Sequence, residues 1–230
     1  MNNLLEIRQI NKTFHPDKEV KVLALCDINL DIERGGFVVL SGPSGSGKTT
    51  LLNIIGGLDE ASSGKVILDG QLLTGLSEVA LSKTRRDHIG FVFQAYNLIP
   101  VLTARENIEY VMKLQRNSQQ QCDKRTLEVT QKLGIDTLLD KLPNQLSGGQ
   151  QQRVAVARAV AATPKLILAD EPTANLDSKT AASLMDMMQR LNEDEGVTII
   201  FSSHDPEVIK KAKHSIVLKD GKVITNEQHS

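Results

Sequence analysis

The fold of this 230-residue chain is decided by one stretch, Gly42-Pro43-Ser44-Gly45-Ser46-Gly47-Lys48-Thr49. It matches every position of the pattern G-x-x-x-x-G-K-[ST], in which backbone N–H groups surround phosphate oxygens. Glycines are needed there because a Cβ would obstruct both the backbone conformation and the approach of the anion. The alternative is a glycine-rich turn that matches by chance, but such a turn would not need a strand before it and a helix after it. The stretch therefore predicts a site for a nucleoside triphosphate.

The residues around this loop supply that strand and that helix. A short apolar run, Phe37-Val38-Val39-Leu40, precedes the loop, and the apolar content of Thr50-Leu51-Leu52-Asn53-Ile54-Ile55 suits the start of a buried helix. Such a helix presents its N–H groups and its positive dipole end to the phosphates. We expect Lys48 to reach the β- and γ-phosphates and the Thr49 hydroxyl to coordinate Mg²⁺.

The composition allows one large domain and does not suggest a nucleic-acid partner. Lys and Arg number 27 and Asp and Glu 28, so the chain has no overall basic field. Cys26 and Cys122 match no metal-ligand spacing and fit unpaired thiols in a reducing compartment. The N-terminus lacks the pattern of a signal peptide. The most apolar stretch, 154–162, is interrupted by Arg158 and is far shorter than the roughly 20 residues that span a bilayer. We expect any membrane role to come through a partner chain.

Short apolar runs predict an α/β fold with two kinds of sheet. Leu4–Ile10 and Val20–Leu30 are strand-like segments around a polar turn, and Lys65–Leu68 leads into a hairpin-type turn at Asp69-Gly70. These segments predict an antiparallel layer beside the nucleotide core. Further apolar runs, separated by helical stretches, predict the mainly parallel sheet of a doubly wound core. They are residues 89–93, 166–169, 197–201 and 216–218.

Two regions between these runs predict helices. From Thr103 to Leu142 the sequence becomes charged and glutamine-rich, with apolar residues at helical spacing, which indicates a helical insertion. From Ser178 to about Asn192, four residues form an i, i+3, i+4, i+7 stripe that we assign to the core. They are Leu184, Met187, Met188 and Leu191.

Two carboxylates follow the predicted strand 166–169, at the sheet edge where open α/β folds bind ligands. Asp170 would hold Mg²⁺ directly or through water, because a hard cation prefers oxygen ligands. Glu171 would polarise the attacking water as a general base. A solvated acidic turn is the alternative, and we consider it the weaker one after four apolar residues in a chain with a phosphate loop.

Two other polar residues end predicted strands at the same edge. His204 follows the run 197–201, and we expect it to contact the γ-phosphate and orient the attacking water. Gln94 follows the run 89–93 and would offer its amide oxygen to Mg²⁺ or to water. A lone histidine or glutamine would carry little weight without this placement.

A second anion-binding element is predicted about a hundred residues after the phosphate loop, at Leu146-Ser147-Gly148-Gly149-Gln150. It opens a segment, 151–162, with apolar residues at helical spacing. A Ser-Gly-Gly sequence at a helix N-terminus offers exposed N–H groups and a hydroxyl donor. An ordinary helix cap would explain Ser147, but we did not expect it to explain the glycine pair and the glutamine.

These motifs, in this order, resemble the nucleotide-binding subunits of ATP-binding cassette (ABC) transporters over essentially the whole chain. The resemblance identifies Gly42–Thr49 as the phosphate loop, Gln94 as the Q-loop and Leu146–Gln150 as the signature. It also identifies Leu166–Glu171 as Walker B and His204 as the switch histidine, with a D-loop at 175–177. It implies an ATPase with a P-loop NTPase (RecA-like) core. On this basis 1–94 and 147–230 form the core with its antiparallel layer, and 95–146 forms a mainly helical subdomain.

The resemblance also implies the cofactors and the partners. Two such domains meet head to tail, so that the signature of one closes over Mg-ATP held by the phosphate loop of the other. The predicted ATP contacts are Phe14, Gly42, Pro43, Ser44, Gly45, Ser46, Gly47, Lys48, Thr49, Thr50, Ser147, Gly148, Gly149 and Gln150. The predicted Mg²⁺ contacts are Thr49, Gln94 and Asp170, and the predicted catalytic residues are Glu171, His204, Gln94 and Lys48. Transmembrane subunits would hold the dimer on the cytoplasmic face of the inner membrane.

Two segments, 53–59 and 89–108, look most like the branch that powers lipoprotein release and macrolide or peptide efflux. A groove near Gln94 would then receive a short helix of the membrane partner. Its candidate lining is Tyr96, Leu98, Ile99, Pro100 and Leu102, some of which could instead fill the joint between core and insertion.

The sequence departs from the family at a few positions. Phe14 replaces a tyrosine that stacks on adenine, and a phenyl ring can still stack. Ala174 and Ser203 replace glycine and threonine, and Gly35-Gly36 replaces a glutamate-glycine or similar pair. The alternatives to a transporter subunit are a soluble ABC-type switch in DNA repair or translation, a small-molecule kinase, and a regulatory partner that binds ATP without hydrolysing it.

Overall fold

A six-stranded sheet forms the centre of the protein, whose computed structural model describes residues 3–15 and 21–228. Its strands are β3 (Phe37–Ser41), β6 (Ile89–Val92), β7 (Leu166–Ala169), β8 (Thr198–Ser202), β9 (His214–Lys219) and β10 (Lys222–Gln228). They lie in the order β10-β9-β3-β8-β7-β6, and all neighbours are parallel except the β9–β10 pair. The carboxyl ends of β3, β6, β7 and β8 therefore meet at one edge.

A second, antiparallel sheet lies beside the first one. Its strands are β1 (Asn3–Phe14), β2 (Val22–Glu33), β4 (Ser63–Leu68) and β5 (Gln71–Leu72), in the order β2-β1-β4-β5. The predicted hairpin turn Asp69-Gly70 joins β4 to β5. Val20, which we included in the second predicted strand, lies outside the described residues. The two sheets confirm the predicted α/β fold with a mainly parallel core and an antiparallel layer.

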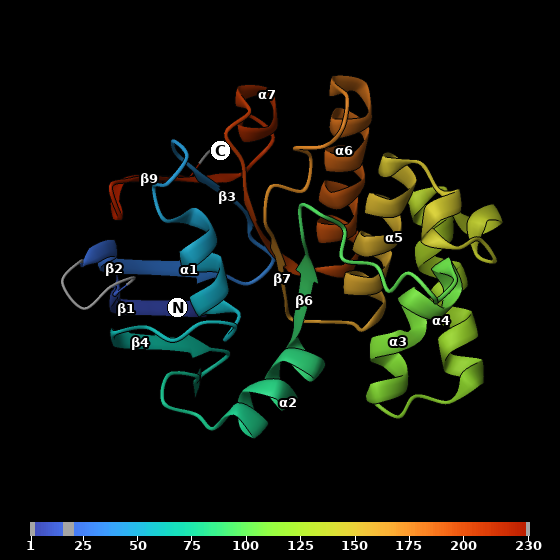
Figure 1. The fold of residues 1–230 in the computed structure, drawn as a ribbon, viewed down its shortest axis with the longest axis horizontal. Coiled ribbons are helices and arrows are strands. Elements are labelled where there is room, and N and C mark those ends of the chain that lie inside the picture. The colour runs from blue at the N-terminus through green and yellow to red at the C-terminus, as the bar shows by residue number, and fades with distance from the viewer. Residues whose placement is uncertain (1–2, 16–20, 229–230) are drawn as a thin grey trace.

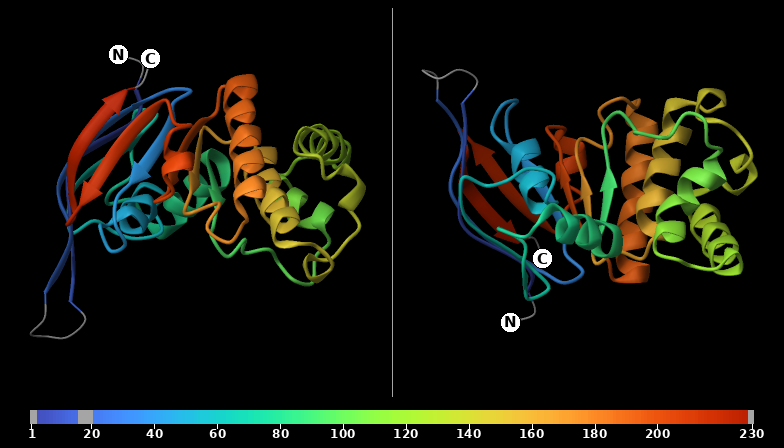
Figure 2. Two further views of the ribbon diagram at one scale, coloured as in Figure 1. Left: turned by 90° about the horizontal axis from the view of Figure 1, so that it is seen from above. Right: turned by 60° about the horizontal axis from the view of Figure 1, so that its bottom comes forward.

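The helices surround the central sheet and extend away from it. They are α1 (Lys48–Ile55), α2 (Glu78–His88), α3 (Ala104–Leu114), α4 (Gln119–Leu133), α5 (Gly148–Ala161), α6 (Ser178–Glu195) and α7 (Pro206–Ile209), with single 3₁₀ turns at Asp136–Leu138 and Pro143–Gln145. Figure 1 shows the antiparallel strands at one end of the molecule and α3 and α4 at the other. Figure 2 shows α6 between these ends. The subdomain limits that we expect, 95 and 146, stay a prediction.

Strand β3 shows how the central sheet is packed on both faces. All of its residues are buried, as they are in β7 and β8. Val38 and Leu40 join one apolar core with α1 and the antiparallel layer, whereas Phe37 and Val39 join another core with α5 and α6. Successive side chains of a strand point to opposite faces, so an unbroken apolar run can serve two cores at once.

The predicted insertion contains α3 and α4, which both begin with a capping box. The hydroxyls of Thr103 and Ser118 accept from the backbone N–H groups of Glu106 and Gln121, whose side chains accept in return. Such reciprocal bonds satisfy N–H groups that have no partner within the helix. Both helices pack against α5, so α5 carries the insertion on the core.

The departure at Gly35-Gly36 has a backbone explanation. Gly35 has φ 71°, a left-handed conformation that strains any residue with a Cβ. Its N–H donates to Thr198 Oγ1 at 2.9 Å, and its carbonyl accepts from Asn192 Nδ2 at 2.9 Å. A Cβ on Gly36 would lie 3.1 Å from the Glu33 carbonyl oxygen. The glycine pair therefore lets a tight turn connect β2 to β3 while it is bonded to α6 and β8.

An ion-pair cluster links α4 to the end of α6. Arg125 pairs with Glu195, Arg125 also donates to the Val160 carbonyl at 3.2 Å, and Lys132 contacts Glu195 at 3.1 Å. Burial raises the pKa of Glu195, but the hydrogen bonds from Arg125 and Lys132 outweigh it and hold that pKa below its usual range. A carboxylate with a lowered pKa stabilises the fold above its unfolded pKa, and this contribution is lost as the pH falls through the folded value.

We predict that Glu195→Gln lowers the free energy of unfolding by about 1–3 kcal/mol at pH 7, because two cations lose their charged acceptor. The difference between variant and wild type should shrink as the pH falls below the usual glutamate range. Urea denaturation at pH 7 and at a pH below the lowered folded pKa of Glu195 measures it. Glu193→Gln is the control, because Glu193 forms a more exposed pair with Lys213, and solvent screens such pairs strongly. Equal losses in both variants would contradict the prediction.

Candidate active site

A cavity of about 740 Å³ lies where β3, β6, β7 and β8 end. Its lining residues are Phe14, Val22, Leu23, Ala24, Pro43, Ser44, Gly45, Ser46, Gly47, Lys48, Thr49, Thr50, Gln94, Glu171, Ala174 and His204. The structure thus brings together the phosphate loop, Phe14, Gln94, Glu171 and His204. Gly42 and Asp170 do not line the cavity but contact residues that do.

The phosphate loop is built so that only glycine fits at its two ends. Gly42 has φ 139° and Gly47 has φ 105°. A Cβ would lie 2.0 Å from the Leu218 carbonyl oxygen at Gly42 and 2.7 Å from the Ala24 carbonyl oxygen at Gly47. These contacts show that the loop is clamped between β9 and β2, so its curvature is imposed by the surrounding sheets.

The start of α1 has the features of an anion site. No side chain caps this helix at Gly47, so its first N–H groups face the loop without a capping oxygen. Lys48 is buried, and its Nζ donates to the carbonyls of Gly42 at 2.8 Å and Pro43 at 3.1 Å. The Ser46 hydroxyl is buried without a hydrogen-bond partner among the described residues. Open N–H groups, an ammonium and a spare hydroxyl fit a triphosphate.

Two predicted metal ligands meet at the edge of this cavity. The Thr49 hydroxyl donates to the Asp170 carboxylate at 2.9 Å, although the residues come from α1 and from the end of β7. Gln94 lines the same cavity. The described residues contain no cluster of three or more His, Cys, Asp or Glu that could hold a metal alone. Oxygen ligands from few side chains suit Mg²⁺, which keeps water and phosphate oxygens as its other ligands.

Ser202, at the end of β8, is a functional residue that the sequence analysis missed. It is fully buried, donates to Asp170 Oδ1 at 2.6 Å and accepts from the Glu171 N–H at 2.8 Å. Its position could have indicated this role, because Ser202 directly follows the β8 residue that is paired with Ala169 of β7. Ser202 therefore holds the carboxylate of Asp170 and the backbone of Glu171 at once.

Glu171 and His204 form a contact pair over the cavity. His204 Nδ1 lies 3.1 Å from both carboxylate oxygens of Glu171. The Glu171 side chain is 16% exposed and the His204 side chain 69% exposed. Glu171 also has φ 46°, a left-handed backbone conformation. Such a conformation costs about 1–3 kcal/mol in a residue other than glycine and is common at functional sites. The pair can take a proton at the carboxylate and present the imidazole to a ligand.

The far end of the cavity is apolar and comes from the antiparallel layer. Phe14 is 41% exposed there, beside Val22 and Leu23, which the sequence analysis did not include in the site. Lys12 Nζ lies 4.7 Å from the centre of the Phe14 ring and donates to Asp59 at 2.6 Å. A ring held on one side by a cation and open on the other is suited to stacking on a base.

The predicted signature lies in a different cavity, of about 440 Å³. Its lining residues are Gly134, Ile135, Leu138, Ser147, Gly148, Gly149, Gln150, Arg153, Asn175, Leu176, Asp177 and Thr180. The two cavities share no lining residue among those the structure describes. One chain therefore holds the phosphate loop and the signature apart.

Local structure also explains which residue types occur in the signature. The Ser147 hydroxyl accepts from the Gln150 N–H at 3.3 Å, and Gln150 Oε1 accepts from the Ser147 N–H at 2.9 Å. This capping box explains the glutamine as well as the serine, which corrects our expectation. A Cβ on Gly148 would lie 2.8 Å from the Tyr96 hydroxyl oxygen, and one on Gly149 would lie 2.7 Å from Thr180 Cγ2. Close packing therefore explains the glycine pair.

A third cavity, of about 340 Å³, is the groove near Gln94. Of the five apolar residues that we expected there, only Ile99 lines it, and Leu98 instead packs against the buried core. The physical reason is a buried side chain of α3, Asn107, which accepts from the Ile99 N–H and donates to the carbonyls of Ile99 and Leu102, so this segment is held against α3. The groove is lined by Leu58, Arg85, Arg86, Ile89, Gly90, Phe91, Phe93, Asn97, Ile99, Tyr110, Val111, Leu114, Arg158, Ala159 and Ala162.

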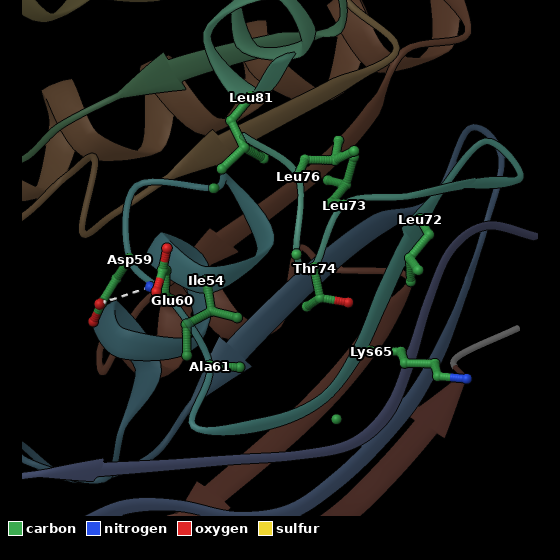
Figure 3. Close-up of a pocket in the computed structure, with 13 residues that line it drawn as sticks. Ile54, Asp59, Glu60, Ala61, Lys65, Leu72, Leu73, Thr74, Leu76 and Leu81 are labelled. Carbon is green, nitrogen blue, oxygen red and sulfur yellow. Dashed lines mark hydrogen bonds between the residues drawn. The ribbon is translucent and has the colours of Figure 1, made fainter. Parts of the chain in front are cut away.

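A fourth cavity, of about 450 Å³, lies between the end of α1, β4 and β5, and the start of α2. Figure 3 shows Leu73, Leu76 and Leu81 together on one side of it and Asp59 on another. None of the predicted phosphate or metal ligands lines it. It is therefore separate from the candidate active site. Among the described residues, no helix has both the length and the apolar character needed to cross a bilayer.

Known proteins resemble this chain over most of its length. The family model described as ABC transporter matches residues 25–174. A model for an AAA domain matches the shorter range 142–210. The chain is 44% identical over 229 residues to the ABC transporter ATP-binding protein MJ0796 of Methanocaldococcus jannaschii, covering 98% of this chain and 97% of that protein.

Three further similarities concern two export systems and one solved structure. The lipoprotein-releasing system ATP-binding protein LolD 1 of Chlorobium chlorochromatii is 40% identical, over 99% of this chain and 93% of that protein. The macrolide export ATP-binding/permease protein MacB of Aggregatibacter actinomycetemcomitans is 44% identical over 98% of this chain, which spans 35% of MacB. The dimeric cassette MJ0796, in a post-hydrolysis state bound to ADP and Pi, superposes with a TM-score of 0.91, covering 98% of this chain and 99% of that one.

We predict that Glu171→Gln reduces the turnover of ATP by roughly 100-fold or more while ATP binding is retained, because the amide keeps the shape but cannot accept the proton. Steady-state phosphate release and the binding of a fluorescent ATP analogue measure the two effects. Glu207→Gln is the control, because Glu207 lies nearby on α7 and does not line the cavity. Unchanged hydrolysis in Glu171→Gln would exclude Glu171 as the general base.

Proposed function

We propose that this chain, which belongs to the ABC transporter family as one of its ATP-hydrolysing subunits, works as a dimer. In this dimer two copies meet head to tail around two Mg-ATP molecules. In this proposal the closing of the dimer on ATP, and its reopening after hydrolysis, change the conformation of membrane partner subunits. Rate enhancement comes from positioning and from charge stabilisation around the γ-phosphate.

One observation carries the proposal: the phosphate loop and the signature line separate cavities of the same chain. A chain cannot close its own signature over its own phosphate loop without rearranging the core between them. A second copy can supply the missing half, and two copies then form two equivalent sites with closed two-fold symmetry. The dimeric form of the similar cassette supports this arrangement.

In the proposed site each group has a separate role. Lys48 and the N–H groups of α1 bind the phosphates, and Thr49, Asp170 and Gln94 hold Mg²⁺, which supplies positive charge next to the transferred group when it is bound. Glu171 accepts the proton of the attacking water, and His204 orients that water. Ser202 keeps Asp170 and Glu171 in place.

We assign the groove lined by Ile99, Tyr110 and Arg158 to a short helix of the transmembrane subunit. Phe93, the neighbour of Gln94 in the chain, lines this groove, and Tyr110 in its lining is 44% exposed. This contact would hold the dimer on the cytoplasmic face of the inner membrane. We further propose residues 95–146 as the subdomain that carries one wall of the groove.

The transported substrate is proposed from the relatives. Proteins named for lipoprotein release, macrolide export and bacitracin export are 40–44% identical to this chain. We therefore propose outward movement of a lipoprotein, peptide or macrolide. The alternative, a soluble switch in DNA repair or translation, is not favoured, because the relatives are named as transporter subunits and the net charge of −1 gives no overall basic field.

We predict that the Glu171→Gln variant dimerises when ATP is added. A double variant that also carries Ser147→Arg should stay monomeric, because the arginine side chain fills the signature cavity. Light scattering at high protein concentration measures the mass. Ser118→Arg in the same background is the matched control, because it removes an equivalent helix cap on α4, outside that cavity. A mass that stays monomeric in Glu171→Gln with ATP and Mg²⁺ would count against the shared site.

We predict that affinity capture with the Glu171→Gln variant as bait recovers a polytopic membrane protein from detergent-solubilised membranes. This protein should have a large extracytoplasmic domain. Mass spectrometry, with and without Mg-ATP, identifies it. Tyr110→Glu should remove the captured protein by placing a charge in the groove, whereas Leu127→Glu, at a similarly exposed position on α4, should not. Recovery of ribosomal or other soluble partners alone would favour the nucleic-acid switch.

A further inference from the structure

The turn that follows Gln94 has an unusual backbone. Tyr96 has φ 62° and Asn97 has φ 48°, so two consecutive residues with a Cβ are left-handed. Each such residue is disfavoured on its own, and a pair persists only where the surrounding structure holds it. The turn is closed by a hydrogen bond from the Asn97 N–H to the Ala95 carbonyl at 2.6 Å. Contacts from the rest of the structure must therefore hold this turn.

Arg158, on α5, binds both carbonyls of this turn. Its Nη1 donates to the Asn97 carbonyl at 2.6 Å and its Nη2 to the Tyr96 carbonyl at 3.0 Å. Burial lowers the pKa of the Arg158 guanidinium. No carboxylate of the described residues lies within ion-pair distance of it. A desolvated cation without an anionic partner is costly, so its bonds to the two carbonyls are its main compensation.

The same turn touches α5 a second time, near the start of the helix. The Tyr96 hydroxyl oxygen lies 2.8 Å from where a Cβ on Gly148 would be. The side chain of Tyr96 thus packs on the signature, while its carbonyl is bound by Arg158 ten residues further along the helix. Asn175, which lines the signature cavity, adds a bond from its Nδ2 to the Gln94 carbonyl at 3.0 Å.

We infer that Arg158 is a positioning residue, which fixes the Gln94 turn against α5 so that Gln94 and the signature move as one body. The planar guanidinium is suited to this task because its two N–H directions match two neighbouring carbonyls, whereas a lysine ammonium is a point charge without this fork. Gln94 reaches the nucleotide cavity from this turn. The inference rests on the proposed function, because its consequence is the placement of Gln94 for Mg-ATP.

The test compares Arg158→Lys with Gln94→Ala and with the double variant. We expect Arg158→Lys to reduce kcat roughly 10-fold, as small misplacements do, and to raise several-fold the Mg²⁺ concentration for half-maximal activity, with a smaller change in the KM for ATP. If Arg158 acts through Gln94, adding Arg158→Lys to Gln94→Ala should change kcat by less than about 2-fold. Arg125→Lys is the control, because Arg125 also donates from the insertion to a carbonyl of α5 but does not contact the turn.

A second measurement does not depend on activity. Hydrogen exchange of a peptide that covers residues 94–100 should become faster in Arg158→Lys and stay unchanged in Arg125→Lys, with the protection of β7 and β8 equal in all proteins. Additive losses of kcat in the double variant, or unchanged exchange in this peptide, would overturn the inference. If wild type itself fails to hydrolyse ATP, the proposed function fails instead, and the exchange result still tests the role of Arg158.

Discussion

The carboxylate of Asp170 joins three segments that are far apart in the chain. It accepts hydrogen bonds from Thr49, at the start of α1, and from Ser202, at the end of β8, and Asp170 itself directly follows β7. These bonds set the distance between the phosphate loop and the neighbouring strand ends. Because Ser202 also accepts from the Glu171 N–H, the proposed general base depends on the same junction.

Most of the central sheet could be predicted from the sequence because its strands are continuous apolar runs. Strand β7 has the predicted limits, and β8 and β9 differ only at their ends. Helix α2 and strand β10 were missed for the opposite reason. Thr84 is the one buried residue of α2, and β10 lies at the sheet edge without a buried residue, so neither has an apolar pattern.

Site residues could be predicted where a sequence motif or the end of a strand marks them. They could not be predicted where only a tertiary contact places a residue in the site. Val22 and Leu23 line the nucleotide cavity from another sheet, and Ser202 reaches Asp170 across a strand pair. The signature shows the reverse case, since the sequence marked Ser147 and Gln150 but not that they bond each other. In the single chain their polar atoms satisfy each other, so an anion would compete with an existing helix cap.

The order of strands also has a consequence for synthesis on the ribosome. Strand β3 lies between β8 and β9, which are made some 160 residues after it. The wall that clamps Gly42 comes from Leu218, near the end of the chain. A nascent chain that has emerged only as far as α5 therefore lacks both neighbours of β3 and cannot shape the phosphate loop. Nucleotide binding thus begins only after β9 has been made, and until then the apolar run of β3 is a segment that chaperones can recognise.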